Sequence, residues 1–313
     1  MDWRIKGAIQ KVLGVLPRGE QAHYWLQKRA GGLRKFDAEC DAKLEDLRLM
    51  LGHLRASGIA IAGTRYLEVG TGWYPTFPYC LYLLGAKRVE TFDLNRYLKP
   101  PLVRSMVERV RGKLAMLAEA GERDLAEVTE RYGRLARHVA AGASLEDATE
   151  GVVQYHAPAD ASRTGLGKDA VDVVFSNSVL EHVPGPVIED MFEESLRILP
   201  PGGVMFHSVN CGDHYAYADR KISQLHYLQF SEERWAFWNN AFLYQNRLRA
   251  SDFTKMARDA GFAVEIDTSR PHPERLRQLD EITVHPSFAR YPREQLAITS
   301  IDFVARRPRP ASA

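Results

Sequence analysis

The chain is poor in cysteine, and its three thiols stand far apart in the sequence: Cys40, Cys80 and Cys211. An odd number of scattered thiols excludes a disulfide framework and offers no cluster of metal-binding thiolates. His207, His214 and His226 also lack the close spacing of zinc ligands. We therefore expect no metal site, and we expect a reducing compartment, the cytoplasm.

Long apolar runs and an excess of one charge are missing as well. No stretch of 18 apolar residues occurs, so no helix is expected to span a bilayer. The apolar stretch 9–16 is interrupted by Lys11 and lacks a small-residue cleavage site, so no signal peptide is expected. The 42 Lys and Arg nearly balance the 40 Asp and Glu, and a net charge of +2 does not indicate a nucleic-acid partner.

The most informative segment of the 313-residue chain runs from Thr64 to Asn95. Its pattern predicts a strand, a glycine loop, a helix and a second strand. Gly70 and Gly72 carry no Cβ atom, which lets a ligand approach the backbone of the loop. Asp93 ends the second strand, at the distance from the loop where an acid can accept hydrogen bonds from both ribose hydroxyls.

Two residues near the loop indicate which ligand it prefers. The dinucleotide fingerprint places a third glycine where this chain has Pro75, which disfavours a pyrophosphate and hence a nicotinamide-dependent oxidoreductase. Glu68 precedes the loop, and its carboxylate would repel a phosphate. The same carboxylate suits a ligand that carries an ammonium group and a sulfonium.

These residues resemble the first two motifs of the class I S-adenosylmethionine-dependent methyltransferases. The motifs read Glu68-x-Gly70-x-Gly72 followed by Asp93. Two later segments resemble the same family, in the same order: D-x-V-x-S-x-S-V-L-E-H-V over 172–183 and Leu-Pro-Pro-Gly-Gly over 199–203. The resemblance implies an S-adenosyl-L-methionine-dependent methyltransferase with an α/β fold, a doubly wound, mostly parallel seven-stranded Rossmann-like sheet.

The motifs and the resemblance together imply a set of cofactor-binding residues: Glu68, Gly70, Thr71, Gly72, Asp93, Leu94, Asp160, Ala161, Asn177 and Ser178. In the family an acid and a small residue lie beside the adenine, and Asp160 and Ala161 match that position. An Asp shortly after Pro158 is almost as typical of a simple turn. Asn177 and Ser178 follow the fourth predicted strand, which in the family ends beside the methyl group.

The additions to this pattern predict the organisation of the chain: an N-terminal helical segment (1–58) and a methyltransferase domain (59–308) that contains a helical hairpin insertion (100–148) and an acceptor or lid segment (210–248). Residues 3–16 have an apolar side and are expected to pack on the protein itself, with a weak membrane-surface contact left open. Residues 23–29 and the aromatic stretch 226–244 fit either an acceptor pocket or a core. We expect residues 269–296 to cover the edge of the sheet and Ser251 to cap a helix that ends at Gly261.

The predicted reaction is methyl transfer to an oxygen of a small molecule or glycan. Asp213 and His214 follow the fifth strand and are the first candidates for a general base, and His182 is the second. His182 could equally cap the following helix. A catalytically silent module that binds S-adenosylmethionine or assembles with a partner is the alternative, and the oligomeric state stays open.

Overall fold

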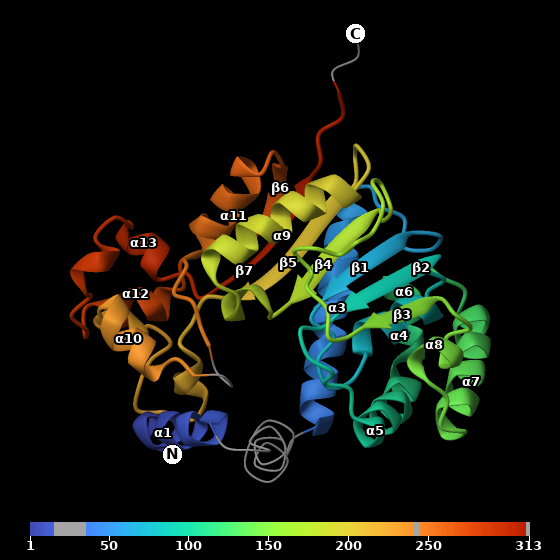
Figure 1. The fold of residues 1–313 in the computed structure, drawn as a ribbon, viewed down its shortest axis with the longest axis horizontal. Coiled ribbons are helices and arrows are strands. Elements are labelled where there is room, and N and C mark those ends of the chain that lie inside the picture. Colours follow the sequence, from blue (N-terminus) through green and yellow to red (C-terminus); the bar gives the residue numbers. More distant parts are fainter. Residues whose placement is uncertain (16–35, 241–243, 311–313) are drawn as a thin grey trace.

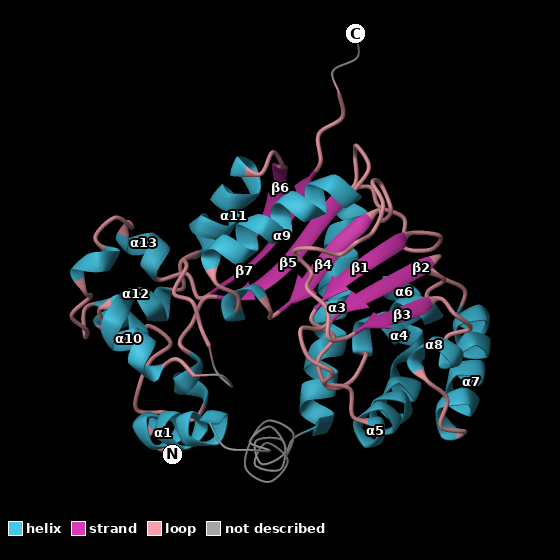
Figure 2. Cartoon of the chain, in the orientation of Figure 1, coloured by secondary structure: helices cyan, strands magenta, loops and turns pink. Residues whose placement is uncertain are grey.

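A computed structural model describes residues 1–15, 36–240 and 244–310, and a twisted sheet with helices on both faces forms its centre (Figures 1 and 2). The strands are β1 (Arg65–Val69), β2 (Arg88–Phe92), β3 (Val153–His156), β4 (Val173–Asn177), β5 (Val204–Asn210), β6 (Ala263–Asp267) and β7 (Ser300–Arg306). Their order is β3-β2-β1-β4-β5-β7-β6. Only β7 is antiparallel to its neighbours, β5 and β6, so the predicted doubly wound Rossmann-like sheet is confirmed.

The described residues form helices in each region where the sequence pattern predicts them and in further regions as well. The α-helices are α1 (Trp3–Val15), α3 (Phe36–Ala56), α4 (Thr76–Leu83), α5 (Pro100–Val110), α6 (Leu114–Ala120), α7 (Leu125–Ala140), α8 (Leu145–Ala148), α9 (Gly185–Ile198), α10 (Glu232–Trp238), α11 (Ala250–Asp259), α12 (Pro273–Leu279) and α13 (Arg293–Leu296). Short 3-10 turns are η2 (Arg111–Lys113), η3 (Leu180–His182), η4 (His214–Tyr217), η5 (His226–Gln229) and η6 (Pro286–Phe288).

Alternate side chains of each central strand enter two separate hydrophobic cores, as the twofold period of a strand requires. Tyr66 of β1 packs toward α3 and α4, whereas the next residue, Leu67, packs toward α9 and α11. Val173 and Val174 of β4 divide in the same way. Both faces of the sheet are therefore covered, which is why its strands read as nearly continuous apolar runs.

The insertion between β2 and β3 is a packed layer of helices. Its first arm is broken at Gly112 into α5, η2 and α6, and α7 returns alongside it. Val107 and Leu135 are buried in the same core as α3 and α4. The predicted hairpin is present, with α8 as an extra helix that the sequence pattern did not predict.

A second group of elements lies to one side of the sheet, and we call it the lobe: α1, η4, η5, α10, α12, η6 and α13 (Figure 1). Its members share one hydrophobic cluster around Trp3, Tyr215 and Trp235. The expectation that residues 269–296 cover the edge of the sheet is wrong, because Leu279 and Phe288 pack into this cluster instead.

Three further expectations can be compared with the structure. Ser251 does not cap its helix: α11 begins at Ala250, because the Asp252 carboxylate accepts a hydrogen bond from the Arg249 N–H at 2.7 Å. Residues 23–29 and Phe242 lie outside the described residues. Among the helices that are described, none combines the length and apolar character needed to cross a bilayer.

Candidate active site

The glycine loop follows β1 at the carboxyl edge of the sheet, where ligands of open α/β folds bind. Gly70 and Gly72 have φ values of +84° and +75°, a region that favours glycine. A Cβ atom on Gly70 would lie 2.5 Å from the Val179 side chain, whereas a Cβ on Gly72 would meet nothing within 4 Å. Gly70 thus allows the loop to pack on the segment after β4, and Gly72 leaves room for a ligand.

Asp93 follows β2 and faces this loop. Both of its carboxylate oxygens lie 3.2 Å from the Gly72 N–H, and the Tyr155 hydroxyl donates to it at 2.9 Å. Burial raises the pKa of Asp93 to about 6, and its hydrogen bonds oppose that shift. The carboxylate retains lone pairs that could accept the hydroxyl groups of a ribose.

Glu68 lies beneath the loop rather than on its surface. It is 4% exposed, and its carboxylate accepts a hydrogen bond from the Thr91 hydroxyl at 2.6 Å. Glu68 and Thr91 are register partners of β1 and β2, and Thr71 in turn bonds to Thr91. Burial raises the pKa of Glu68 to about 7. Glu68 therefore lies where it supports the glycine loop, and it would affect a ligand on that loop indirectly.

Helix α3 brings charges to the same edge that the motifs did not reveal. The Lys43 ammonium lowers the pKa of both Glu68 and Asp93, although burial raises each pKa more. The Asn177 amide donates to Asp46 at 3.2 Å, at the end of β4. No local signal marks Lys43, Asp46 or Tyr155, because each depends on packing between distant elements.

The candidates on the adenine side lie close to Asp93. The Ala159 N–H donates to the Asp93 carbonyl at 2.9 Å, which brings the segment with Asp160 and Ala161 to the end of β2. The Asp160 carboxylate accepts hydrogen bonds from the N–H and hydroxyl of Ser162, both at 2.8 Å. Asp160 thus forms a turn with Ser162, and its exposed carboxylate is also free to contact an adenine, so both interpretations of this residue stay open. Leu94 is 71% exposed at the same place.

Beyond β4 and β5 the structure brings together Glu181, His182 and His214. One potential ligand atom of each lies within 4.8 Å of the other two. Glu181 is 1% exposed, and neither of its carboxylate oxygens has a hydrogen-bond partner. Burial raises the pKa of Glu181 to about 8 and lowers the pKa of His214 to about 3. His182 does not cap α9, whose N-cap is Pro184.

Asp213 does not join this group. Its side chain is fully buried, caps η4 through the Tyr215 N–H at 2.8 Å, and contacts the His226 ring at 2.9 Å. The ring of His214, its neighbour in sequence, belongs to the group with Glu181 and His182, and its buried Nε2 atom has no hydrogen-bond partner. Asp213 and His214, the first candidates for a general base, are neighbours in sequence, but their side chains belong to different groups in the structure.

Comparison with known proteins assigns the chain to a family. A family model described as a methyltransferase domain matches residues 41–265, more than two thirds of the sequence. The chain belongs to this methyltransferase family. Its cofactor is S-adenosylmethionine, and the open space at Gly72 beside the Asp93 carboxylate fits that molecule.

Solved methyltransferases are similar to the chain at low sequence identity. An S-adenosylmethionine-dependent methyltransferase from Mesorhizobium loti is 18% identical, with 82% of this chain and 96% of that chain covered and a TM-score of 0.44. A geranyl diphosphate methyltransferase in complex with S-adenosylmethionine is 14% identical, with coverages of 87% and 90% and a TM-score of 0.45. A comparison with curated proteins finds no match.

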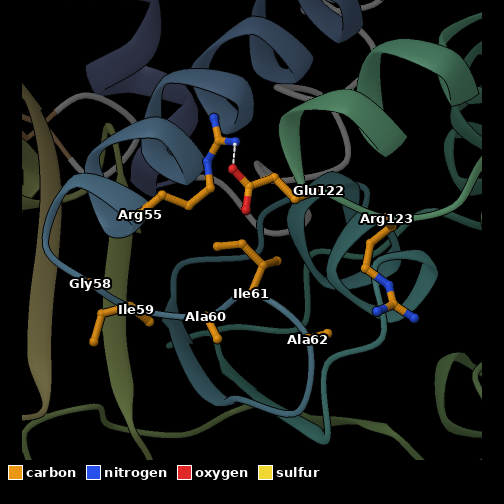
Figure 3. A pocket seen from close by; sticks show the side chains of 9 residues that line it. Arg55, Gly58, Ile59, Ala60, Ile61, Ala62, Glu122 and Arg123 are labelled. Atoms are coloured by element: carbon orange, nitrogen blue, oxygen red, sulfur yellow. Dashed lines mark hydrogen bonds and ion pairs between the residues drawn. The ribbon is translucent and has the colours of Figure 1, made fainter.

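The cavity of this methyltransferase shown in Figure 3 lies at the opposite end of β1 from the glycine loop. It has a volume of about 330 Å³ and is lined by Arg55, residues 58–62 and residues 121–123. An ion pair of 2.8 Å between Arg55 and Glu122 spans it. The residues predicted to bind the cofactor gather at the carboxyl ends of the strands, so this cavity lies away from them.

Two other histidines of this methyltransferase, His207 and His226, were considered as zinc ligands from the sequence. In the structure both contact other side chains instead. His207 is buried in the core, and its Nδ1 lies 2.7 Å from the Ser176 hydroxyl. His226 contacts Asp213 and packs against Trp3 at a ring separation of 4.8 Å. Neither belongs to a group of metal-competent side chains within the described part of the chain.

Proposed function

We propose that this methyltransferase transfers a methyl group to an oxygen atom of a small molecule or glycan. The observation that carries the proposal is the meeting of two sets of residues at one edge of the sheet. The ribose-binding acid and glycine loop lie at β1 and β2, and the histidine pair with Glu181 lies beyond β4 and β5. A nucleophile placed between the two sets would face the methyl donor.

The cofactor side has a role for each element. Asp93 holds the ribose, and Gly70, Thr71 and Gly72 provide the backbone of the loop. Lys43 is well placed to bind the carboxylate of the methionine moiety, since its charge already acts on Glu68 and Asp93. Leu94, Asp160 and Ala161 would contact the adenine, and Asn177 and Ser178 the region of the methyl group.

The residues on the acceptor side lie where a hydroxyl acceptor would have to lose its proton. When bound, S-adenosylmethionine supplies an activated methyl group on a sulfonium. His182 and His214 lie where an acceptor hydroxyl must lose its proton, since they follow β4 and β5 on the same edge. Asp213 supports the turn that presents His214. The chain must also hold the acceptor in line with the methyl group and exclude water.

The aromatic part of the segment 210–248 suggests the class of acceptor. Tyr217 is 63% exposed, and its ring lies 5.6 Å from the His214 ring. Flat rings and sugars stack on such exposed aromatic faces. Trp235, by contrast, is buried in the lobe, so this part of the segment is a core.

The wider setting of the reaction follows the predicted organisation. We assign residues 59–308 to the catalytic domain, with 1–58, 100–148 and 210–248 as additions around it. The three cysteines are all buried and free, which fits a reducing compartment such as the cytoplasm.

Two measurements test this function. Calorimetry should show binding of S-adenosylmethionine and of its demethylated product to the full chain. Incubation of the protein with cell extract and isotopically labelled methyl donor, followed by mass spectrometry, should reveal a labelled small molecule or glycan with the label on oxygen. Failure to bind either form of the cofactor would exclude the proposal, and label on nitrogen or carbon would exclude O-methylation.

A further inference from the structure

Glu181 is a buried acid whose carboxylate forms no hydrogen bond within the described residues. Both carboxylate oxygens are buried without a hydrogen-bond partner. Burial raises its pKa, and the nearby backbone N–H groups of Glu181 and Asn210 lower it less, since neither is placed to form a hydrogen bond of normal geometry with it. A buried carboxylate without a partner costs several kcal/mol unless a cation or proton compensates it.

The two histidines beside it also present free nitrogen atoms. His182 uses Nδ1 toward the Tyr244 carbonyl at 2.7 Å, which leaves Nε2 as a lone-pair donor. His214 Nε2 is buried and has no partner. The two rings stand edge to face with their centres 4.9 Å apart. One carboxylate and two imidazoles therefore converge without bonding to each other.

A strip of three residues, 244–246, holds all three groups in place. The Tyr244 carbonyl orients His182, and the Gln245 side chain accepts the backbone N–H of His214 at 3.1 Å. The Asn246 N–H donates to the Glu181 carbonyl at 2.8 Å. The first of these bonds fixes the ring and tautomer of His182, as outer-layer partners do in metal sites, and the other two fix the backbone at His214 and Glu181.

We propose that Glu181, His182 and His214 bind a divalent transition-metal ion that holds the acceptor oxygen. Two imidazoles and one carboxylate suit Zn²⁺, Fe²⁺, Co²⁺ or Mn²⁺ better than Mg²⁺, which prefers oxygen ligands. Ligand atoms around such an ion lie about 3 to 4 Å apart. The three atoms, now within 4.8 Å of each other, need to close by roughly 1 Å. This assignment replaces our expectation of no metal site.

Three protein ligands leave coordination positions open for the acceptor. A hydroxyl bound to the cation becomes more acidic and gives its proton to water, and the electron pair stays on the oxygen that accepts the methyl group. The inference rests on the proposed function for the acceptor, but metal binding itself does not.

The test measures metal binding without any turnover. The full chain is stripped with a chelator and titrated with Co²⁺ and Zn²⁺, by calorimetry and by the visible absorption of bound Co²⁺. We expect one equivalent to bind, and Glu181→Gln and His214→Gln to weaken the dissociation constant by about tenfold or more. His272→Asn is the matched control, because His272 is exposed on α12 and Asn can still cap that helix.

Each outcome decides one claim. Binding of S-adenosylmethionine is measured on the same metal-free samples, and it also shows that each variant is folded. A wild-type chain that binds S-adenosylmethionine but no metal overturns the metal site and leaves the proposed function standing. Metal binding that survives both Glu181→Gln and His214→Gln overturns the site too. Metal binding without cofactor binding supports the site and rejects the proposed function.

Discussion

Asp93 is a buried acid at the edge of the sheet where we propose that the cofactor binds. Its side chain is almost fully buried, yet it faces the open space beside Gly72. Burial raises its pKa to about 6, and the Gly72 N–H and Tyr155 hydroxyl lower it again. Tyr155 thus acts as a positioning residue, because it keeps the acid ionised near neutral pH.

The cofactor affinity should therefore depend on pH through Asp93. In the proposed complex the ionised carboxylate accepts hydrogen bonds from both ribose hydroxyls, and protonation removes that capacity as the pH falls below about 6. We expect the dissociation constant for S-adenosylmethionine to rise about tenfold per pH unit below that value. Calorimetry between pH 4.5 and 7.5 measures this.

Two variants distinguish the contribution of Asp93 to cofactor binding from that of its neighbour Tyr155. Asp93→Ala should weaken binding by more than about tenfold at pH 7, and its affinity should no longer follow the acid limb. Tyr155→Phe should shift the midpoint of that limb upward, because the carboxylate loses a donor. A wild-type affinity that stays constant from pH 7.5 to 4.5 would contradict the role of Asp93.

Glu68 should make the fold less stable as the pH rises. Its pKa is about 7 in the folded protein and 4.5 in a solvated chain, so the folded state binds the proton more tightly between those values. The contribution of this group to stability is fully present below pH 4.5 and is lost as the pH rises through 7. It amounts to about 3 kcal/mol.

The substitution Glu68→Gln tests this linkage, since glutamine can still accept the Thr91 hydrogen bond. Urea unfolding of both proteins at pH 5 and pH 8 gives two differences in unfolding free energy, in which all other titrating groups cancel. We expect the variant to gain about 2.5 kcal/mol relative to wild type between pH 5 and pH 8. Parallel pH profiles would show that Glu68 is not buried as described.

The two glycines of the loop, Gly70 and Gly72, differ in what surrounds them, so substitution of each should have a different effect. Gly70 packs against Val179, so Gly70→Ala adds a clash to the strain of a positive φ and should cost about 1–3 kcal/mol of stability. The added substitution Val179→Ala should recover part of that loss. Thermal unfolding of the single and double variants measures the coupling.

Gly72→Ala should behave in the opposite way. Its Cβ meets no protein atom, so the fold should lose only about 1–2 kcal/mol from backbone strain. The same Cβ enters the space assigned to the cofactor and should weaken S-adenosylmethionine binding by about tenfold or more. Equal affinities for Gly72→Ala and wild type would show that the ligand does not approach this backbone.

In the whole molecule, the N-terminal helix α1 packs in the lobe against residues that lie more than two hundred positions later in the chain. The Trp3 N–H donates to Asp219 at 3.1 Å, and its ring packs on Trp238 at 4.6 Å. Arg249 joins the lobe to the sheet, because its buried guanidinium donates to the Tyr227 hydroxyl at 2.6 Å and the Cys211 carbonyl at 2.9 Å. Lobe and sheet thus depend on contacts between residues far apart in sequence.

Trp3→Ala should loosen the lobe and spare the cofactor side. Loss of this buried ring should cost about 3 kcal/mol or more. Hydrogen exchange should become faster in 214–238, while the affinity for S-adenosylmethionine stays unchanged. Ile5→Ala on the same helix is the control, because Ile5 is 57% exposed and its loss should change stability by less than about 0.5 kcal/mol. Equal exchange in both variants would contradict the packing of α1.

The sheet and the cofactor loop were predictable because their signals are local. A strand, its loop and its terminal acid are neighbours in sequence, so Gly70, Gly72 and Asp93 mark the ligand edge without any knowledge of the packing. The apolar runs of the central strands also indicate a sheet covered on both faces. The assignment of Gly70, Gly72 and Asp93 to the cofactor remains a prediction, as does that of Asp160 and Ser178.

The contacts across the site could not be read from the sequence. Tyr155, Lys43 and the group of Glu181, His182 and His214 come from separate elements, and no spacing along the chain encodes their distances. The position of residues 269–296 was mistaken for the same reason, because their apolar residues fit a sheet edge and the lobe equally well. Periodicity shows which face of an element is buried, and only the packed structure shows which partner covers it and which charges meet there.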